Sequence, residues 1–490
     1  MLIGLWLAPY LVSHIGTIAY GFVPIAAILT EYISVITNAL NQAISRYLVL
    51  NIQKADWDDA NRTFNTAFFS NVVVFLLQLP LLGILLFNLN SLFTIPSELK
   101  SDVMALCLLS MLAFSISVFS SVFSTSMFAY NRLDLQRMMD IIRFALRVGT
   151  IVVGFTLDTP KLLYVGIGEF LAALVLLLIS TVYWRKLTPK LHISISSFDR
   201  GRLKNVLSMS GWLIINYVGY LLFIKIDLIV VNNFIGPKVT GEYAAVLQWS
   251  NVIRTVVSVL AELVSPLILA AYAKEDFERL KYILVTSMKF LGAAVAIITG
   301  IIMVQSYSLL NIWIGPEIAQ IYPLMILLVV HLSVNLSVLP LFTVFTAYNR
   351  VTIPGILTLV GGVMNFGLAV FFAKFTDLGI YGVALAGLIV LTLKNGVFTP
   401  IYASRIMKLG MGTFVSPILK SVISMGMVAL VAQLVRFFVI DSWAKLAISS
   451  AIIGIAVLPM IWFVIFNRED RKFIIGLVPQ SIRNKVKWLD

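Results

Sequence analysis

Charged residues and cysteines are scarce in this chain of 490 residues. Only 12% of its residues are Asp, Glu, Lys or Arg and 60% are hydrophobic, whereas a soluble domain has about 25% charged residues. Such a composition excludes a water-soluble globule of ordinary type. The single cysteine, Cys107, excludes a disulfide within the chain, and the three histidines are too scattered for the ligand spacing of a metal site.

Motifs that would power or catalyse a reaction are also missing. No Walker sequence occurs, and Gly166-Ile167-Gly168 lacks the strand-to-helix context of a phosphate-binding loop. We therefore predict no cofactor and no ATPase within the chain, which leaves a proton or sodium gradient as a source of energy. The longest loop on the predicted outer side runs only from Asn88 to Ser101, which leaves little room for the site of a membrane glycosyltransferase or polymerase.

Apolar stretches of about 20 residues, the length that crosses a bilayer as a helix, recur along the chain. They predict an all-α integral membrane protein with about fourteen transmembrane helices. The spans are expected at residues 1–13, 20–50, 64–88, 102–128, 138–157, 161–183, 205–235, 241–271, 284–310, 320–346, 352–374, 378–402, 415–438 and 444–466.

The distribution of Lys and Arg orients these spans. One side of the predicted membrane carries 27 of the 36 basic residues and the other side carries 6. Because cytoplasmic loops are enriched in Lys and Arg, both termini are predicted to be cytoplasmic, in a multi-pass protein of the plasma or inner membrane. This orientation also accounts for the net charge of +13, so nucleic acid is not predicted as a partner.

An internal repeat divides the chain. Ala129-Tyr130-Asn131-Arg132 recurs as Ala347-Tyr348-Asn349-Arg350, and a second match runs without gaps at an offset of 220 residues. The matched pairs at that offset are Gly16 and Gly236, Gly21 and Gly241, Ser45 and Ser265, Lys54 and Lys274, Asp56 and Asp276, Thr66 and Thr286, and Pro96 and Pro316.

The repeat predicts two parallel six-helix lobes, because an even number of helices returns the chain to the side on which it entered. Their pseudo-twofold axis would lie along the membrane normal, as in known transporters. We expect an N-lobe at 1–198, a C-lobe at 199–410, two additional helices at 411–466 and a basic cytoplasmic tail at 467–490. The first helix is shorter than its partner in the second lobe, which predicts a true start upstream of Met1.

Polar residues form matching stripes on the second helix of each lobe. Glu31, Asn38, Asn41 and Gln42 fall on one face of the span 20–50, with Ser34 and Ser45. At the offset of 220, the span 241–271 carries Asn251, Arg254, Ser258, Glu262 and Ser265 on the same stripe. Such residues either pack helices together through hydrogen bonds or line a water-filled cleft, and the charged members favour the cleft.

Further ionisable residues lie within predicted spans: Lys225 and Asp227 are deep, and Lys394 lies toward the cytoplasmic side. Lys225, Arg254 and Lys394 would make a cationic cavity for an anionic head group, since a guanidinium donates two parallel hydrogen bonds to phosphate. The alternative is that Lys225 and Asp227, two residues apart, each pair with a different helix. Glu169 is either a coupling carboxylate or a paired structural one.

Local sequence resembles a known family. The residues Tyr20-Gly21, the segment from Leu40 to Tyr47, and Ala60-Asn61-Arg62-Thr63-Phe64-Asn65-Thr66-Ala67 are similar to the N-terminal half of polysaccharide flippases. These are the Wzx-like, O-antigen and oligosaccharide flippases of the multidrug/oligosaccharidyl-lipid/polysaccharide exporter superfamily.

The resemblance implies that a glycan linked to a polyprenyl phosphate or diphosphate is flipped to the outer leaflet by alternating access, without catalysis. Membrane lipids and glycan-assembly membrane proteins would be the other partners. Rival functions are a multidrug or cation antiporter and a lipid II-type flippase. On this hypothesis Arg254, Lys225, Arg46 and Lys394 bind the phosphate, Asn38, Asn41, Gln42 and Ser258 bind sugar hydroxyls, and Glu31, Asp227 and Glu262 bind the coupling ion.

Overall fold

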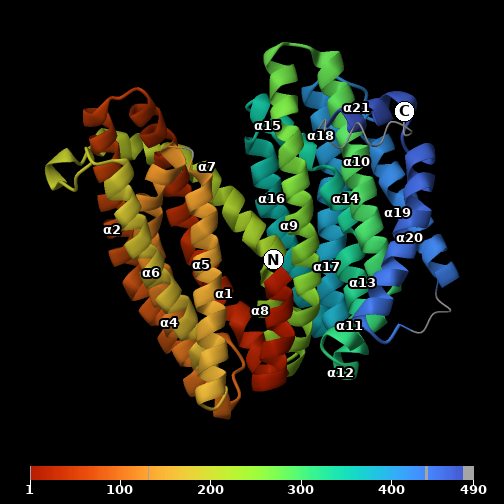
Figure 1. The fold of residues 1–490 in the computed structure, drawn as a ribbon, viewed down its shortest axis with the longest axis horizontal. Helices are drawn as coiled ribbons and strands as arrows, with labels where there is room; N and C mark the ends of the chain where they lie inside the picture. The colour runs from red at the N-terminus through yellow and green to blue at the C-terminus, as the bar shows by residue number, and fades with distance from the viewer. Residues whose placement is uncertain (1, 131, 436–439, 478–490) are drawn as a thin grey trace. The chain divides into compact units, whose positions relative to one another are not determined.

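The protein is an all-helical membrane protein in two compact units. The computed structural model describes residues 2–130, 132–435 and 440–477, and every element in these ranges is helical (Figure 1). One unit comprises Trp6–Gly241, and the other comprises Glu242–Asp490 with Met1–Leu5. The chain therefore passes from one unit to the other after residue 241, whereas the repeat places the boundary between the lobes at residue 199. The difference arises because the two helices that follow the linker belong to the unit Trp6–Gly241.

The first unit is built from long helices in which α6 packs along α4 and α5 (Figure 1). Its elements are α1 (Leu2–Gln53), α2 (Trp57–Phe87), α3 (Leu89–Leu92), the 3-10 turn η1 (Ser97–Leu99), α4 (Lys100–Ala129), α5 (Leu133–Leu157), α6 (Leu162–Leu187), the 3-10 turn η2 (Ile195–Ser197), α7 (Arg200–Ile224) and α8 (Ile226–Phe234).

The second unit packs α10 against α19 and α16 against α17. Its elements are α9 (Pro237–Ala273), α10 (Phe277–Val304), α11 (Ser306–Trp313), α12 (Pro316–Ala319), α13 (Tyr322–Val330), α14 (Leu332–Ser337), α15 (Leu339–Ala347), α16 (Thr352–Phe375), α17 (Gly379–Thr392), the π-helical turn η3 (Leu393–Phe398), α18 (Thr399–Ile406), α19 (Val415–Val435), α20 (Trp443–Val464) and α21 (Arg468–Leu477).

Every predicted span coincides with a helix or a run of consecutive helices. Among the described residues, eleven helices are long and apolar enough to cross a membrane, and a twelfth span is the pair Ile214–Ile224 and Ile226–Phe234, bent by 45°. The number of spans predicted from the sequence, fourteen, is higher than this number for two reasons. Helix α1 covers two predicted spans that meet at a break at Gly16, and α5 is too rich in charge to count by composition.

The two repeats share local backbone conformations. Gly16 and Gly236 have φ angles of 80° and 132°, and Ala55 and Glu275 have φ angles of 56° and 55°. Asp56 and Asp276 each cap the following helix by accepting a backbone N–H bond of 3.1 Å, from Asp59 and Arg279 respectively. A side-chain oxygen at this position satisfies a donor that the helix itself leaves open.

The glycine pair Gly21 and Gly241 marks a close approach of two backbones. A Cβ atom built on Gly241 would lie 1.9 Å from the carbonyl oxygen of Thr17, and one built on Gly21 would lie 2.9 Å from the amide nitrogen of Gly241. Helix α1 therefore crosses the first turn of α9 where neither chain has room for a side chain.

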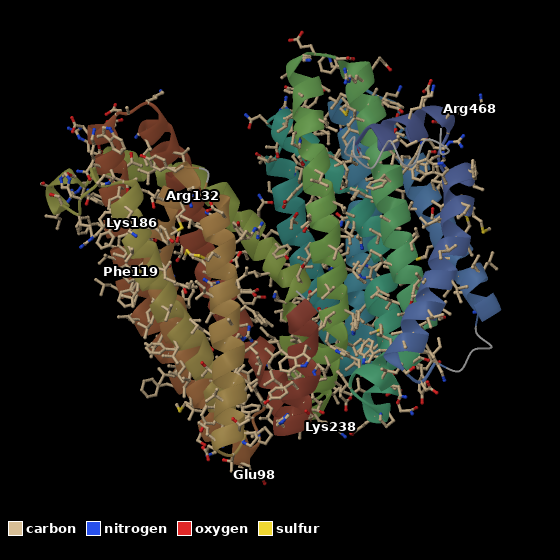
Figure 2. The ribbon with its side chains drawn as sticks, viewed as in Figure 1. Glu98, Phe119, Arg132, Lys186, Lys238 and Arg468 are labelled. Atoms are coloured by element: carbon tan, nitrogen blue, oxygen red, sulfur yellow. The ribbon has the colours of Figure 1, made fainter. Side chains whose placement is uncertain are left out.

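The apolar residues of the first unit serve two environments. At the predicted cytoplasmic end, Phe64 stacks on Trp184 with ring centroids 5.1 Å apart, inside a buried cluster that includes Phe123. Leu77 and Phe87 on α2 are 70% and 86% exposed, as expected of side chains that face lipid. Figure 2 shows Glu98 at one end of this unit and Arg132 and Lys186 toward the other.

Candidate functional site

The break between α7 and α8 positions the first candidate group. Lys225 lies between the two helices, which are bent by 45° at this point. Its ammonium donates to the carboxylate Oε1 of Glu31 on α1 over 3.0 Å. The Lys225 and Glu31 side chains are 24% and 39% exposed. The structure therefore pairs a predicted phosphate ligand with a predicted coupling carboxylate.

Two neighbours extend this ion pair. Asp227 is 7% exposed on the first turn of α8, and Tyr32 lies within electrostatic range of both Asp227 and Glu31. The Tyr32 hydroxyl is buried without a hydrogen-bond partner in the described part of the chain. The group thus includes the carboxylates of Glu31 and Asp227 and the Tyr32 phenol besides the Lys225 ammonium, so it is not purely cationic.

A second polar group lies in the second unit, at the break between α13 and α14. His331 occupies the break and its Nδ1 lies 2.6 Å from the Nδ2 of Asn335. The two side chains are therefore within hydrogen-bonding distance, one turn apart. Arg254 on α9 lies within electrostatic range of this histidine. Arg254 itself is half-buried, so the break at His331 has a cation near it.

Lys394 lies in the π-helical turn η3, where α17 passes into α18. Its ammonium lies 5.4 Å from the centroid of the Phe342 ring, a cation–π contact. Its carbonyl accepts a hydrogen bond of 3.0 Å from the Thr399 hydroxyl, which fills part of the gap that the wider turn opens. Short π-helical turns often mark functional sites, so Lys394 remains a candidate ligand.

The other predicted site residues make only local contacts, are exposed, or pair within their own unit. The Ser258 hydroxyl donates to the carbonyl of Thr255 in its own helix at 2.9 Å, and Glu262 is exposed. Glu169 forms an ion pair of 3.0 Å with Arg147, which supports the structural alternative for that carboxylate. Four predicted ligands lie outside the residues whose side chains the structure describes: Asn38, Asn41, Gln42 and Arg46.

The family-like segment 60–67 has a role that sequence reasoning missed. Asn61 Oδ1 accepts from the backbone N–H of His192 at 3.1 Å, Asn65 Oδ1 accepts from that of Ser194 at 2.7 Å, and Thr66 Oγ1 accepts from that of Asp199 at 3.1 Å. These three side chains on α2 hold the linker that joins the repeats. The segment therefore fixes the path of the chain between α6 and α7.

A buried ion pair in the second unit was also missed. Lys289 on α10 donates to Asp470 Oδ2 on α21 over 2.6 Å, and Thr286 donates to Asp470 Oδ1 over 2.7 Å. The Lys289 and Asp470 side chains are only 8% and 1% exposed. The beginning of the predicted basic tail is therefore a helix that docks on the bundle through a charge.

Comparison with known proteins supplies the family. A family described as "Polysaccharide biosynthesis protein" matches residues 1–269. The chain belongs to this family. An uncharacterized membrane protein of Bacillus subtilis (strain 168), EpsK, is 28% identical over 475 residues, which cover 96% of this chain and 94% of that protein. The similarity to the Bacillus protein thus extends over almost the whole length of both chains.

Solved structures with the same fold are known. A MATE multidrug resistance transporter of the MOP superfamily, in an inward-facing conformation, matches with a TM-score of 0.70 and 16% identity, over 82% of this chain and 94% of its own. The lipid II flippase MurJ, in an inward closed conformation, matches with a TM-score of 0.67 and 15% identity, over 94% and 95% of the two chains. The predicted superfamily fold is confirmed.

Proposed function

We propose that this protein translocates a lipid-linked oligosaccharide or polysaccharide precursor from the cytoplasmic to the outer leaflet. The observation that carries the proposal is that a member of the polysaccharide biosynthesis family has the fold of a lipid II flippase along 94% of its length. A transport fold in a glycan-assembly family fits movement of the glycan precursor better than its synthesis. The role would be non-enzymatic, and the membrane would be the plasma membrane.

The substrate in this proposal is a glycan on a polyprenyl phosphate or diphosphate. Its phosphate would engage Lys225, Arg254, Lys394 and Arg46, and its sugars would engage Asn38, Asn41, Gln42 and Ser258. Charged hydrogen bonds to phosphate are stronger than neutral ones. Because Lys225 already pairs with Glu31 at 3.0 Å, the phosphate would compete with that carboxylate for the ammonium.

Energy for the cycle would come from an ion gradient. Alternating access requires two states whose relative stability the bound ligand or ion changes. Glu31, Asp227 and Glu262 are the proposed carboxylates for a proton or sodium ion, and Glu31 is the one whose partner, Lys225, is also a proposed substrate ligand. Ion binding at Glu31 and substrate binding at Lys225 would therefore each affect the same ion pair.

We expect Lys225→Ala and Arg254→Ala each to lower the surface glycan at least about tenfold, since loss of a charged hydrogen bond costs roughly 1.5–3 kcal/mol. Surface glycan is measured in cells while membrane expression is confirmed. Lys445→Ala is the matched control, because Lys445 pairs with Asp441 in an exposed position at 2.8 Å. Unchanged glycan in both variants would remove the phosphate-binding roles of these cations.

The MATE match, with its TM-score of 0.70, supports a second candidate, a multidrug or cation antiporter. A cation-binding cavity needs acidic groups, and Glu31 and Asp227 supply two carboxylates within electrostatic range of Tyr32. Reconstituted protein separates the two functions. Flipping of a fluorescent polyprenyl-diphosphate glycan with no efflux of lipophilic cations supports the proposal, and the opposite result supports the antiporter.

The proposed orientation has its own test. Cys107 is buried, so the native chain should not react with a membrane-impermeant thiol reagent. We expect Glu98→Cys to be labelled in intact cells and Lys186→Cys to be labelled only after permeabilisation, because these residues lie toward opposite ends of the first unit (Figure 2). The reverse labelling pattern would place the termini outside.

A further inference from the structure

A pocket of about 400 Å³ opens at the predicted outer end of the first unit. It is lined by Asn90 and Ser91 of α3, by Phe93 and Thr94 in the loop that follows, by Lys100 at the start of α4 and by Asn233 at the end of α8. The volume is within the range of small-ligand sites, roughly 300–1,000 Å³. None of these residues belongs to the site proposed above.

The lining is chemically selective. Two carboxamides and two hydroxyls can both donate and accept hydrogen bonds, as sugar hydroxyls require, and Phe93 supplies an apolar surface beside them. In the second repeat, 220 residues on, Leu310, Ile314 and Gln320 correspond to Asn90, Thr94 and Lys100, whereas Asn311 and Trp313 keep the polar and aromatic character of Ser91 and Phe93. The positive charge of Lys100 is therefore a property of the first repeat.

Lys100 is an uncommitted cation on a face that has few. Of the other basic residues predicted on this side, Lys161 and Lys445 pair with aspartates and Lys374 lies over the Phe375 ring. In contrast, within the described ranges Lys100 has no carboxylate, carbonyl or ring partner. An exposed ammonium in a polar pocket favours an anionic ligand.

Asn232, next to the pocket, carries an unused donor. Its Oδ1 accepts from the backbone N–H of Thr94 at 2.9 Å, which fixes the loop that forms one wall. The side chain is 1% exposed, and its Nδ2 is buried with no hydrogen-bond partner in the described part of the protein. An unmet buried donor costs free energy, and here it lies directly behind a pocket wall.

We propose that this pocket binds a sugar that carries a phosphate or carboxylate group, as an exit subsite on the outer side. Lys100 would hold the anionic group, while Asn90, Asn233 and Ser91 would hold the hydroxyls. The proposal rests on the proposed function, because a flipped lipid-linked glycan presents its sugars and its phosphate at this face. The subsite would take the head group after translocation and before release.

The test uses the full-length protein in nanodiscs and three soluble probes: N-acetylglucosamine 1-phosphate, N-acetylglucosamine and inorganic phosphate. We expect N-acetylglucosamine 1-phosphate to bind at least about tenfold more tightly than N-acetylglucosamine or inorganic phosphate. Each of the two smaller probes can form only some of the contacts with the pocket that the sugar phosphate forms. Lys100→Met should reduce binding of the sugar phosphate to that of the neutral sugar, and Lys100→Arg should restore it. Asn233→Leu should weaken both sugars equally.

Lys161→Met is the matched control, because it removes a lysine from the same predicted side outside the pocket. If the native protein, Lys100→Met and Asn233→Leu all bind N-acetylglucosamine 1-phosphate with equal affinity, the proposed subsite is overturned. A flipping assay on the same preparations separates the two hypotheses. Translocation with Lys100-independent binding overturns only the subsite, whereas Lys100-dependent binding without translocation supports the subsite and overturns the proposed function.

Discussion

Replacing Asp470 with alanine is expected to lower the stability of the protein by about 3–5 kcal/mol, because it leaves a buried ammonium without its counter-charge. Lys289 is 8% exposed and donates to Asp470 at 2.6 Å, so water cannot readily replace the carboxylate. The measurement is the midpoint of thermal unfolding in detergent. Helix α21 should also become sensitive to protease, because Asp470 fixes its first turn.

Two variants make this prediction specific. Glu469→Ala changes the exposed neighbour and should leave the midpoint within about 1 °C, since exposed charges contribute little. The double variant Lys289→Met and Asp470→Leu should recover most of the loss, because an apolar pair of similar volume often replaces a buried ion pair without cost. A double variant as unstable as Asp470→Ala would show that the charge pair is not the cause.

Gly241→Ala is expected to be the second most damaging single substitution, with a loss of at least about 2 kcal/mol from overpacking. The added methyl would lie 1.9 Å from the backbone oxygen of Thr17, and a backbone atom cannot rotate away as a side chain can. The crossing of α1 and α9 would have to open. Expression level and the thermal midpoint in detergent report the effect.

Gly454→Ala is the control for this substitution. Gly454 lies in α20 and a Cβ atom there meets nothing within 4 Å, so alanine should be neutral or slightly stabilising because it is the better helix former. Equal midpoints for Gly241→Ala and Gly454→Ala would mean that the close approach at residue 241 is not required for folding.

Most of the fold could be predicted from the sequence because the bilayer demands it. A lipid-spanning chain must satisfy its backbone polar groups within each helix, so long apolar stretches such as 162–187 have one stable form. The repeat could also be predicted, because identical residues such as Gly16 and Gly236, or Asp56 and Asp276, recur at one constant offset of 220 residues. Both signals can be found in the sequence without knowledge of the tertiary structure.

The candidate site could be predicted only in part, because its contacts are not local. Sequence predicts that Lys225 and Glu31 are functional but not that they pair, since 194 residues separate them. No Pro or Gly signals the break at Lys225, and nothing near Lys289 signals Asp470, 181 residues later. Asn61 and Asn65 were recognised by resemblance alone, and their hydrogen bonds to the linker required the fold.

The Glu31–Lys225 pair has an electrical consequence. As it stands, the two side chains contribute no net charge. An anion that takes the ammonium leaves the carboxylate alone in a medium where an unpaired charge is costly, and uptake of a proton restores the balance. On the proposed function, the charge that crosses the membrane in each cycle would depend on whether that proton travels with the anion or returns. The proton cancels one negative charge when it travels with the anion, so the size of the current during turnover, and not its sign, would report which of the two occurs.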